Sequence, residues 1–244
     1  MDINGMRESK AHFLSSHVGF FDTNSSESLV TLLSNNIAEI LESTIQKEGR
    51  ASLAVSGGRT PIPLFVELSK LNLDWSKVEL TLADDRWLDS YHEASNERLV
   101  RKYLIKNKAI NARFIPLKSS YKTARIGQIH SEKIFKEMKL PLDVIVLGMG
   151  SDGHTASLFP CSDELSEAMN TNYPNFLIST NPKTAPYERI SLSAKTISSS
   201  KKIFLHLNGS EKLGTLEAAM QLKDINKMPI YNFLKEGLDI YWSP

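Results

Sequence analysis

The stretch DVIVLGMGSDGHTASLFP, residues 143–160, runs from an apolar segment into a loop that contains glycines, an acid and an imidazole. The glycines of the loop are Gly148, Gly150 and Gly153. Their spacing is that of a dinucleotide-binding fingerprint, whereas Asp152 and His154, two positions apart, are typical of a hydrolytic or proton-transfer site. The residues that follow the loop distinguish the two interpretations.

These flanking residues do not favour a dinucleotide site. Such a site needs a helix of useful length after its glycines and an acid at the end of the next strand, about 20 residues further on. Here Pro160 interrupts the segment, the motif lies past the middle of the chain, and the next acids, Asp163 and Glu164, are predicted to begin a helix. A nucleophile elbow, G-x-S-x-G, nearly fits around Ser151, but Met149 occupies its first glycine position, which counts against an α/β-hydrolase.

His154 therefore remains as a candidate for catalysis, on a glycine loop at the carboxyl end of an apolar strand. Asp152 is close enough in sequence to orient the imidazole or to share its task. A lone histidine is usually structural or simply exposed, so both interpretations stay open on this motif alone.

Composition limits the class of protein. The chain has 244 residues, 41% of them hydrophobic, which is enough for a sizeable core, and we expect a single domain over residues 1–244. Lys and Arg number 29 against 28 acids, so the net charge of +1 provides no global field toward nucleic acid or an anionic membrane. The single cysteine, Cys161, excludes an internal disulfide and fits a reducing compartment. The N-terminus has no signal-peptide pattern and no run reaches the ~18 apolar residues of a membrane helix, so we expect a cytoplasmic protein.

Predicted helices and strands alternate along the chain. Asn24 and Glu27 lie at capping-box spacing ahead of an apolar repeat that ends at Gly49, which predicts a helix. Strands are predicted at residues 52–56, 78–83, 143–148, 176–180, 189–193, 202–207 and 238–242, and further helices at 63–71, 96–106, 122–138 and 211–222. Strands that are apolar throughout and separated by helices predict an α/β fold, a largely parallel central sheet with helices on both faces. Such sheets bind ligands at the carboxyl ends of their strands.

A second strand end, in VSGGRTPIPLF at residues 55–65, carries two glycines. The loop residues are Ser56, Gly57, Gly58, Arg59 and Thr60, and two prolines then begin a helix. Adjacent glycines let successive amides point at one spot, and the helix N-terminus adds partial positive charge, so the loop suits a phosphate. It lacks the lysine and the spacing of a nucleotide P-loop, and a plain Gly-Gly turn is the alternative.

Charged residues mark two further places. Asp84 and Asp85, after the next strand, fit either a solvated turn with an internal salt bridge or a functional role. Arg86 beside them could neutralise charge that develops on an oxyanion. Arg189 begins a strand, and Lys212 lies at the start of a helix, where a cation opposes the helix dipole unless an anion sits nearby. Together with the two-glycine loop, these residues indicate a pocket for a phosphorylated small molecule.

In this order and at these separations, the motifs resemble the 6-phosphogluconolactonase family. The resemblance spans the chain from about Ser52 to its end and is carried by SGGRTP, DDRW followed by SN, GMGSDGHTASLFP, and the late arginine and lysine. It implies the α/β fold shared with glucosamine-6-phosphate deaminases and ribose-5-phosphate isomerases, no metal or cofactor, and hydrolysis of 6-phosphoglucono-δ-lactone in the oxidative pentose phosphate pathway. The positions that match catalytic residues of the family are His154, Asp152 and Arg86. The positions assigned to the phosphate are Ser56, Gly57, Gly58, Arg59, Thr60, Arg189 and Lys212.

Three positions refine the resemblance. Arg59 stands where the family often has serine, which either adds a charge to the phosphate site or points to solvent, and Asp85 stands where glutamate is common. Phe159 lies five residues after His154, where the deaminases carry a glutamate that assists proton transfer in ring opening. An apolar ring cannot do this, so the resemblance favours lactone hydrolysis over amino-sugar deamination.

The chemistry of a lactone then suggests a mechanism. We expect His154 to remove a proton from a water that attacks the ring carbonyl, without a covalent intermediate, because a δ-lactone is already activated relative to an acyclic ester. Asp152 would orient the imidazole or stabilise its charged form, and Arg86 would stabilise the oxyanion. The expected partner is a small sugar-phosphate lactone, with no nucleic acid and no membrane, and the protein is expected to be a monomer or a homodimer. The alternatives are a deaminase or isomerase of the same fold, a serine esterase through Ser151, and a non-catalytic sugar-phosphate-binding module.

Overall fold

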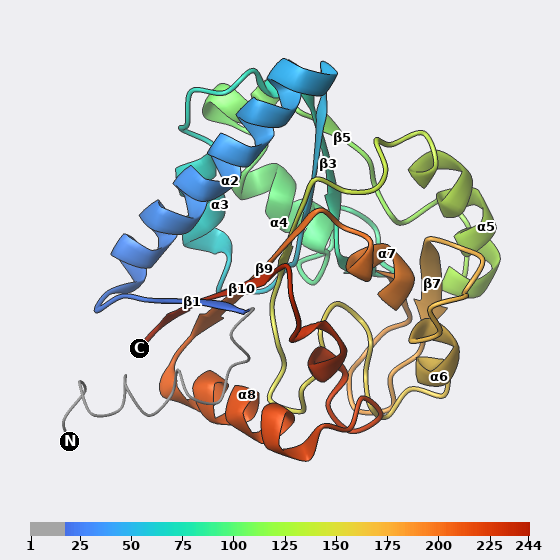
Figure 1. The fold of residues 1–244 in the computed structure, drawn as a ribbon. Coiled ribbons are helices and arrows are strands. Elements are labelled where there is room, and N and C mark those ends of the chain that lie inside the picture. Colours follow the sequence, from blue (N-terminus) through green and yellow to red (C-terminus); the bar gives the residue numbers. More distant parts are fainter. Residues whose placement is uncertain (1–17) are drawn as a thin grey trace.

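Seven strands form the central sheet of the protein. The computed structural model describes residues 18–244 and gives the strand order β1-β10-β9-β6-β2-β3-β5 (Figure 1). The strands are β1 (Gly19–Asp22), β2 (Ala51–Val55), β3 (Val78–Leu82), β5 (Arg113–Phe114), β6 (Val144–Leu147), β9 (Lys202–Asn208) and β10 (Leu238–Ser243). Every pairing within this sheet is parallel, so the carboxyl ends of the strands lie at one edge.

Helices cover both faces of this sheet. They are α2 (Ser26–Glu48), α3 (Ile62–Leu68), α4 (Asn96–Tyr103), α5 (Ala124–Phe135), α6 (Leu165–Ala168), α7 (Ala194–Ser198) and α8 (Ser210–Leu222), with 3-10 turns at Trp75–Lys77, Asn107–Asn111 and Pro229–Phe233. Figure 1 shows α2 and α3 on one side of the strands and α5 and α7 on the other. The predicted α/β fold with a largely parallel central sheet is confirmed. None of the helices in residues 18–244 has the length and apolar character that crossing a bilayer requires.

Side-chain caps fix where the helices begin. Ser25, rather than the predicted Asn24, caps α2, because its side chain accepts a hydrogen bond from the backbone N–H of Ser28. The helix ends as predicted at Gly49, whose φ of 79° lies in the left-handed region. The side chain of Thr123 caps α5, so this helix begins later than the predicted 122–138, and it ends at Phe135.

Two of the predicted strands belong to a separate sheet. β7 (Leu177–Thr180) and β8 (Arg189–Leu192) pair antiparallel, and β8 also pairs antiparallel with β4 (Asp84–Arg86). The connection between β7 and β8 is too short to carry a helical crossover, so the two strands form a hairpin instead of entering the parallel sheet. β4 itself is not predicted from the sequence, because its three residues are all charged and show no hydrophobic period.

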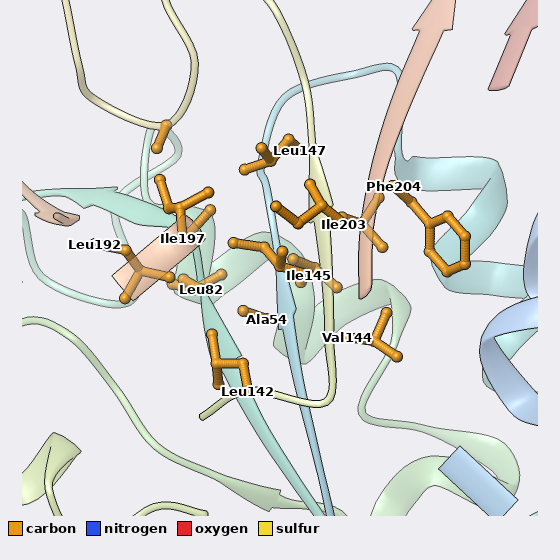
Figure 2. Close-up of a cluster of buried hydrophobic side chains, with 14 of the residues drawn as sticks. Ala54, Leu82, Leu142, Val144, Ile145, Leu147, Leu192, Ile197, Ile203 and Phe204 are labelled. Carbon is orange, nitrogen blue, oxygen red and sulfur yellow. The ribbon is translucent and has the colours of Figure 1, made fainter. Parts of the chain in front are cut away.

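The hydrophobic core lies on both faces of the central sheet. In Figure 2, Ile197 of α7 and Leu192 of β8 lie on the same side of β6 as Ile145. Val144 and Phe204 point the other way, toward the face that α2 covers (Figure 2). All five side chains are buried. A strand with two buried faces has no polar positions to alternate with, which is why the sequence of β6 is apolar throughout.

Candidate active site

A cavity of about 270 Å³ opens at the carboxyl edge of the central sheet. The neighbouring strands β2 and β6 lie at its centre, and the chain continues from β2 to β3 on one side and from β6 to β9 on the other. Loops that diverge in this way open a crevice, where open α/β sheets bind their ligands. The predicted catalytic and phosphate-binding residues that line this cavity are Ser56, Gly57, Gly58, Arg59, Thr60, Arg86, His154, Arg189 and Lys212.

Asp152 and His154 form a hydrogen-bonded pair at one wall of the cavity. Oδ1 of Asp152 lies 2.5 Å from Nδ1 of His154 and also accepts a hydrogen bond from the His154 backbone N–H at 3.2 Å. An ionised carboxylate can only accept, so Nδ1 carries the proton when the imidazole is neutral, and Nε2 keeps the lone pair that a general base needs. His154 lines the cavity and Asp152 does not. Asp152 therefore orients the ring from behind.

The glycines of this loop leave space for neighbouring side chains, including those of Asp152 and His154. A Cβ on Gly150 would lie 2.1 Å from Nδ1 of His154 and 2.6 Å from Oδ1 of Asp152. Gly153 has a φ of 74°, and a Cβ there would lie 2.6 Å from the sulfur of Met228. Both glycines are needed because side chains approach their backbone more closely than a Cβ permits, which explains the fingerprint-like spacing without a dinucleotide.

The environment of the pair sets the charge of Asp152. Burial by itself would raise the pKa of this carboxyl, but the hydrogen bond and the charge interaction with His154 outweigh it and hold the pKa below its ordinary value. The carboxylate therefore stays ionised at neutral pH and can stabilise an imidazolium. On the face of the imidazole, the buried ring of Phe159 stacks with a centroid distance of 3.9 Å and an interplanar angle of 22°.

Four cationic side chains line the same cavity: Arg59, Arg86, Arg189 and Lys212. Arg86 and Arg189 are partners in the β4–β8 register, so two guanidinium-bearing residues lie opposite each other. Burial lowers the pKa of Arg189, Asp84 opposes this effect, and the charge of Arg86 adds to it. Two like charges in a partly buried wall favour the binding of an anion. The resemblance assigns Arg86 to catalysis and Arg189 to the phosphate, and the register places the two residues side by side.

The loop after β2 joins this basic wall to the loop of His154. Ser56 is buried, and its Oγ accepts a hydrogen bond from the backbone N–H of Gly148 at 3.3 Å. Gly58 has a φ of 97°, and a Cβ added there would meet nothing within 4 Å. Glycine is therefore favoured at this position by its backbone conformation and not by a lack of space. Arg59 and Thr60 are exposed and line the cavity. The loop therefore presents both backbone and side-chain groups to a ligand.

Asp84 and Asp85 are buried, so their interpretation as a solvated turn is wrong. Asp85 accepts hydrogen bonds from the backbone N–H groups of Asn96 and Glu97 at 2.7 and 3.0 Å, and it thereby caps α4. Burial raises the pKa of Asp85 to about 7, against the lowering effect of these hydrogen bonds. Asp84 lies 3.7 Å from Nη1 of Arg189 and lines the cavity.

Three polar residues line the cavity although the sequence analysis gives them no role: Asn96, His206 and Asn208. The SN that follows DDRW is a signal that could have identified Asn96. His206 is buried in β9, where burial lowers its pKa to about 4, and its Nδ1 has no hydrogen-bond partner. No local signal identifies His206, because it occupies one position of an otherwise apolar strand core.

Comparisons with known proteins cover nearly the whole chain. Residues 24–242 match the family model described as glucosamine-6-phosphate isomerases/6-phosphogluconolactonase. A 6-phosphogluconolactonase of Pseudomonas aeruginosa is 39% identical over 216 residues, which are 87% of this chain and 89% of that protein. A 6-phosphogluconolactonase of Neisseria meningitidis serogroup A is 42% identical over 193 residues, which are 78% of this chain and 82% of that protein.

Solved structures agree. The crystal structure of a 6-phosphogluconolactonase from Shewanella baltica superimposes with a TM-score of 0.92 at 42% identity, covering 95% of this chain and 100% of that one. A monomeric glucosamine-6-phosphate deaminase has a TM-score of 0.75 at 17% identity, covering 93% of this chain and 97% of that one, which shows a common fold. The resemblance predicted from the motifs is confirmed, and this protein belongs to the glucosamine-6-phosphate isomerase/6-phosphogluconolactonase family.

Proposed function

We propose that this protein hydrolyses 6-phospho-D-glucono-1,5-lactone to 6-phospho-D-gluconate, the lactonase step of the oxidative pentose phosphate pathway. The observation that carries the proposal is the His154–Asp152 pair at one wall of a cavity that four cationic side chains also line. A base facing a basic wall suits an ester that carries a phosphate. The names of the relatives at 39% and 42% identity support the same reaction.

In this mechanism His154 is the general base. Its Nε2 takes a proton from a water molecule while the water oxygen bonds to the lactone carbonyl carbon, and an electron pair moves onto the carbonyl oxygen. Asp152, hydrogen-bonded to Nδ1, stabilises the imidazolium that forms. When the carbonyl is restored, the bond from carbon to the ring oxygen breaks, and that oxygen takes the proton from His154. The product is an open-chain carboxylic acid, which ionises at neutral pH and releases a proton.

Arg86 stabilises the negative charge on the carbonyl oxygen. Its Nη1 donates a hydrogen bond to the backbone oxygen of Ala94 at 2.6 Å, which fixes the guanidinium before substrate binds. A cation held in place in advance stabilises a developing oxyanion without reorganising during the reaction. The phosphate binds at the loop of residues 56–60 and Lys212, and Arg189, the partner of Arg86 in the β4–β8 register, adds its charge to the same cavity.

Phe159 favours hydrolysis over deamination at this site. Its ring is buried and stacks directly on the imidazole of His154. The position therefore supplies no carboxylate that could carry a proton during ring opening of an amino sugar. The alternative of a deaminase of the same fold predicts ammonia as a product, which gives it a separate test.

The test is proton release from freshly prepared 6-phosphoglucono-δ-lactone in a weak buffer, with and without protein. We expect release well above the spontaneous rate, unchanged by a chelator. The same preparation is incubated with glucosamine 6-phosphate, and we expect no ammonia. Ammonia release, or lactone hydrolysis no faster than in buffer alone, contradicts the proposed function.

The proposal extends to the setting of the enzyme. The phosphorylated substrate and the single cysteine, Cys161, support a cytoplasmic enzyme. We propose a monomer or a homodimer. Cell fractionation and sedimentation velocity check both points, and recovery outside the cytoplasm or a higher oligomer contradicts them.

A further inference from the structure

The two arginines of the cavity wall are held by loops that lie beside the cavity. Nη1 of Arg86 donates a hydrogen bond to the backbone oxygen of Ala94 at 2.6 Å, while its buried Nε has no acceptor among the described residues. Nη2 of Arg189 donates to the backbone oxygen of Pro186 at 3.3 Å. Neither Ala94 nor Pro186 lines the cavity, and both lie beyond the β4–β8 register, whose last pair is Arg86 and Arg189. The positions of the two charges therefore depend on what fixes these loops.

His92 fixes the first of the two loops, residues 87–95. Its Nδ1 accepts a hydrogen bond from the backbone N–H of Ala94 at 3.1 Å, and its backbone oxygen accepts one from the N–H of Ser95 at 3.0 Å. These two bonds hold the peptide groups on either side of Ala94, and the second of these groups contains the oxygen that receives Arg86. An imidazole nitrogen that accepts carries no proton, so the neutral ring keeps its hydrogen on Nε2. The side chain of His92 therefore helps to set the position of the acceptor of Arg86.

Tyr187 joins this loop to the second one, residues 181–188. Its ring meets the ring of His92 edge-on, with a centroid distance of 5.8 Å and an interplanar angle of 72°. It directly follows Pro186, the acceptor of Arg189. Tyr187 has a φ of 73°, in the left-handed region that large side chains rarely adopt, and it is 43% exposed, so burial in the core does not offset the strain. Strained residues of this kind persist where the surrounding structure fixes them, and they cluster at functional sites.

The contact between the two rings opposes a repulsion. Arg86 and Arg189 are partners in the β4–β8 register, and like charges that lie opposite each other repel. Because each guanidinium is bonded to a different loop, this repulsion tends to separate the loops, which His92 and Tyr187 connect.

We propose that His92 and Tyr187 are positioning residues, which hold the guanidinium of Arg86 in place for the carbonyl oxygen of the lactone. The inference rests on the proposed function, in which Arg86 stabilises the oxyanion. A donor that is fixed in advance stabilises the transition state more than a mobile one, because it does not reorganise during the reaction.

The test separates the two contacts of the imidazole by kinetics on 6-phosphoglucono-δ-lactone. His92→Phe keeps a ring against Tyr187 and removes the acceptor for Ala94, and we expect kcat to fall about tenfold with KM within about twofold. His92→Asn keeps an acceptor near the position of Nδ1 and loses only the ring contact, so we expect kcat to fall no more than about threefold. His130→Phe is the matched control, since His130 also contacts a tyrosine ring, that of Tyr121, but lies outside the cavity lining, and it should keep both constants.

A double-mutant cycle shows whether His92 acts through Arg86. In Arg86→Ala, the further change His92→Phe should alter kcat/KM by less than about twofold, because the group that His92 positions is then absent. A residue that only supports the fold of its loop would slow both enzymes by the same factor.

Tyr187 gives a second arm that does not depend on the folding of His92→Phe. Tyr187→Gly accepts the left-handed backbone and removes the ring, and we expect kcat to fall about threefold, with no further loss in the Arg86→Ala background. Tyr187→Phe keeps the ring and should keep the kinetics of the unaltered enzyme.

Three outcomes overturn this inference while leaving the proposed function in place. They are unchanged kcat in both His92→Phe and Tyr187→Gly, a loss in His92→Asn as large as that in His92→Phe, and equal losses with and without Arg86. Failure of the unaltered protein to hydrolyse the lactone, by contrast, contradicts the proposed function itself.

Discussion

His154 is held from several directions at once. Asp152 bonds to its Nδ1, Phe159 stacks on its ring, and Gly150 leaves the space that the ring occupies. An imidazole that is fixed in this way needs no reorganisation before it takes a proton.

Replacing His154 by alanine should remove most of the turnover and leave substrate binding nearly unchanged. We expect kcat to fall by about 10²- to 10⁴-fold, the usual contribution of general-base catalysis, with a small change in the Kd of 6-phosphogluconate. Steady-state kinetics and calorimetric titration check the two effects. The neighbouring Ser151→Ala is the control and should keep full activity. A loss of turnover in Ser151→Ala would support the serine esterase alternative, and wild-type turnover in His154→Ala would remove this histidine from the role of base.

Gly150→Ala should inactivate the enzyme without touching a reacting group. The added Cβ would lie 2.1 Å from Nδ1 of His154, so either the imidazole or the loop must move. We expect kcat to fall by about 100-fold, because small misplacements of a catalytic group cost this much. Gly214→Ala in α8 is the control, since an added Cβ meets nothing within 4 Å there. The control should keep its activity and gain about 0.5–1 kcal/mol in unfolding free energy. Equal kinetics in the two variants would show that the space beside His154 is not needed.

His206 should make the protein less stable as the pH falls. Burial lowers its pKa from 6.5 to about 4, so between these values the unfolded chain binds a proton that the folded protein does not. Above pH 6.5 the buried, neutral His206 costs the folded protein nothing in protonation free energy. As the pH falls from 6.5 toward 4, the free energy of unfolding decreases by up to about 1.4 kcal/mol per pH unit. Urea unfolding of the unaltered protein and of His206→Phe, from pH 7 to pH 4.5, measures the difference in slope. A slope that is the same in both proteins would show that His206 does not titrate differently in the two states.

The open edge of β7 is covered by side chains of α5. Nε2 of Gln128 donates to the backbone oxygen of Leu177 at 2.8 Å, and its Oε1 accepts from the backbone N–H of Ser179 at 2.9 Å. Glu132 accepts from the backbone N–H groups of Phe176 and Leu177. These side chains take the place of a further strand, and they leave no row of unpaired groups for another chain to join.

Gln128→Ala should therefore destabilise the protein and favour self-association. The variant leaves the oxygen of Leu177 and the N–H of Ser179 without these partners, and we expect a loss of about 1–3 kcal/mol in the free energy of unfolding. Urea denaturation and sedimentation velocity measure the two effects. Ile129→Ala on the same helix, at a side chain 71% exposed, is the control and should change stability by less than about 0.5 kcal/mol. Equal stability of the two variants would show that the edge needs no cover.

The fold brings the lining of the cavity together from distant parts of the chain. Lys212 of α8 and the loop after β2 line one cavity although about 150 residues separate them in the sequence. Only the strand order, which places β9 beside β6 and β6 beside β2, makes them neighbours. In the proposed function, the affinity for the phosphate is thus a property of the folded sheet rather than of either segment.

Lys212→Ala should weaken binding of the phosphorylated substrate much more than it slows its turnover. A group that holds the phosphate equally in the ground state and the transition state raises KM when removed, so we expect KM to rise about tenfold or more with kcat within about threefold. Unphosphorylated glucono-δ-lactone is the control substrate, and its kinetics should be the same in both enzymes. Lys212 is a cleaner test than Arg189, whose removal also leaves the buried Asp84 without its ion pair. A fall in kcat at constant KM would instead place Lys212 at the reacting carbon.

Short stretches of the sequence are enough to predict the fold class and several residues of the site. The apolar strands, the helices between them and the glycine loops are local patterns, so the α/β fold and the loops that line the cavity can be predicted from short stretches such as residues 143–160. The pairing of Asp152 with His154 is also within reach, because the two residues are two positions apart on one loop.

Only the tertiary structure decides what depends on register and burial. It pairs Arg86 with Arg189 across an antiparallel sheet, and it turns Asp85 from a surface charge into a buried cap of α4. It also brings Asn96 and His206 to the cavity, from α4 and β9. The physical reason is that these relations join residues far apart in the chain, and their geometry is fixed by which strands pair and how they align rather than by any local sequence pattern.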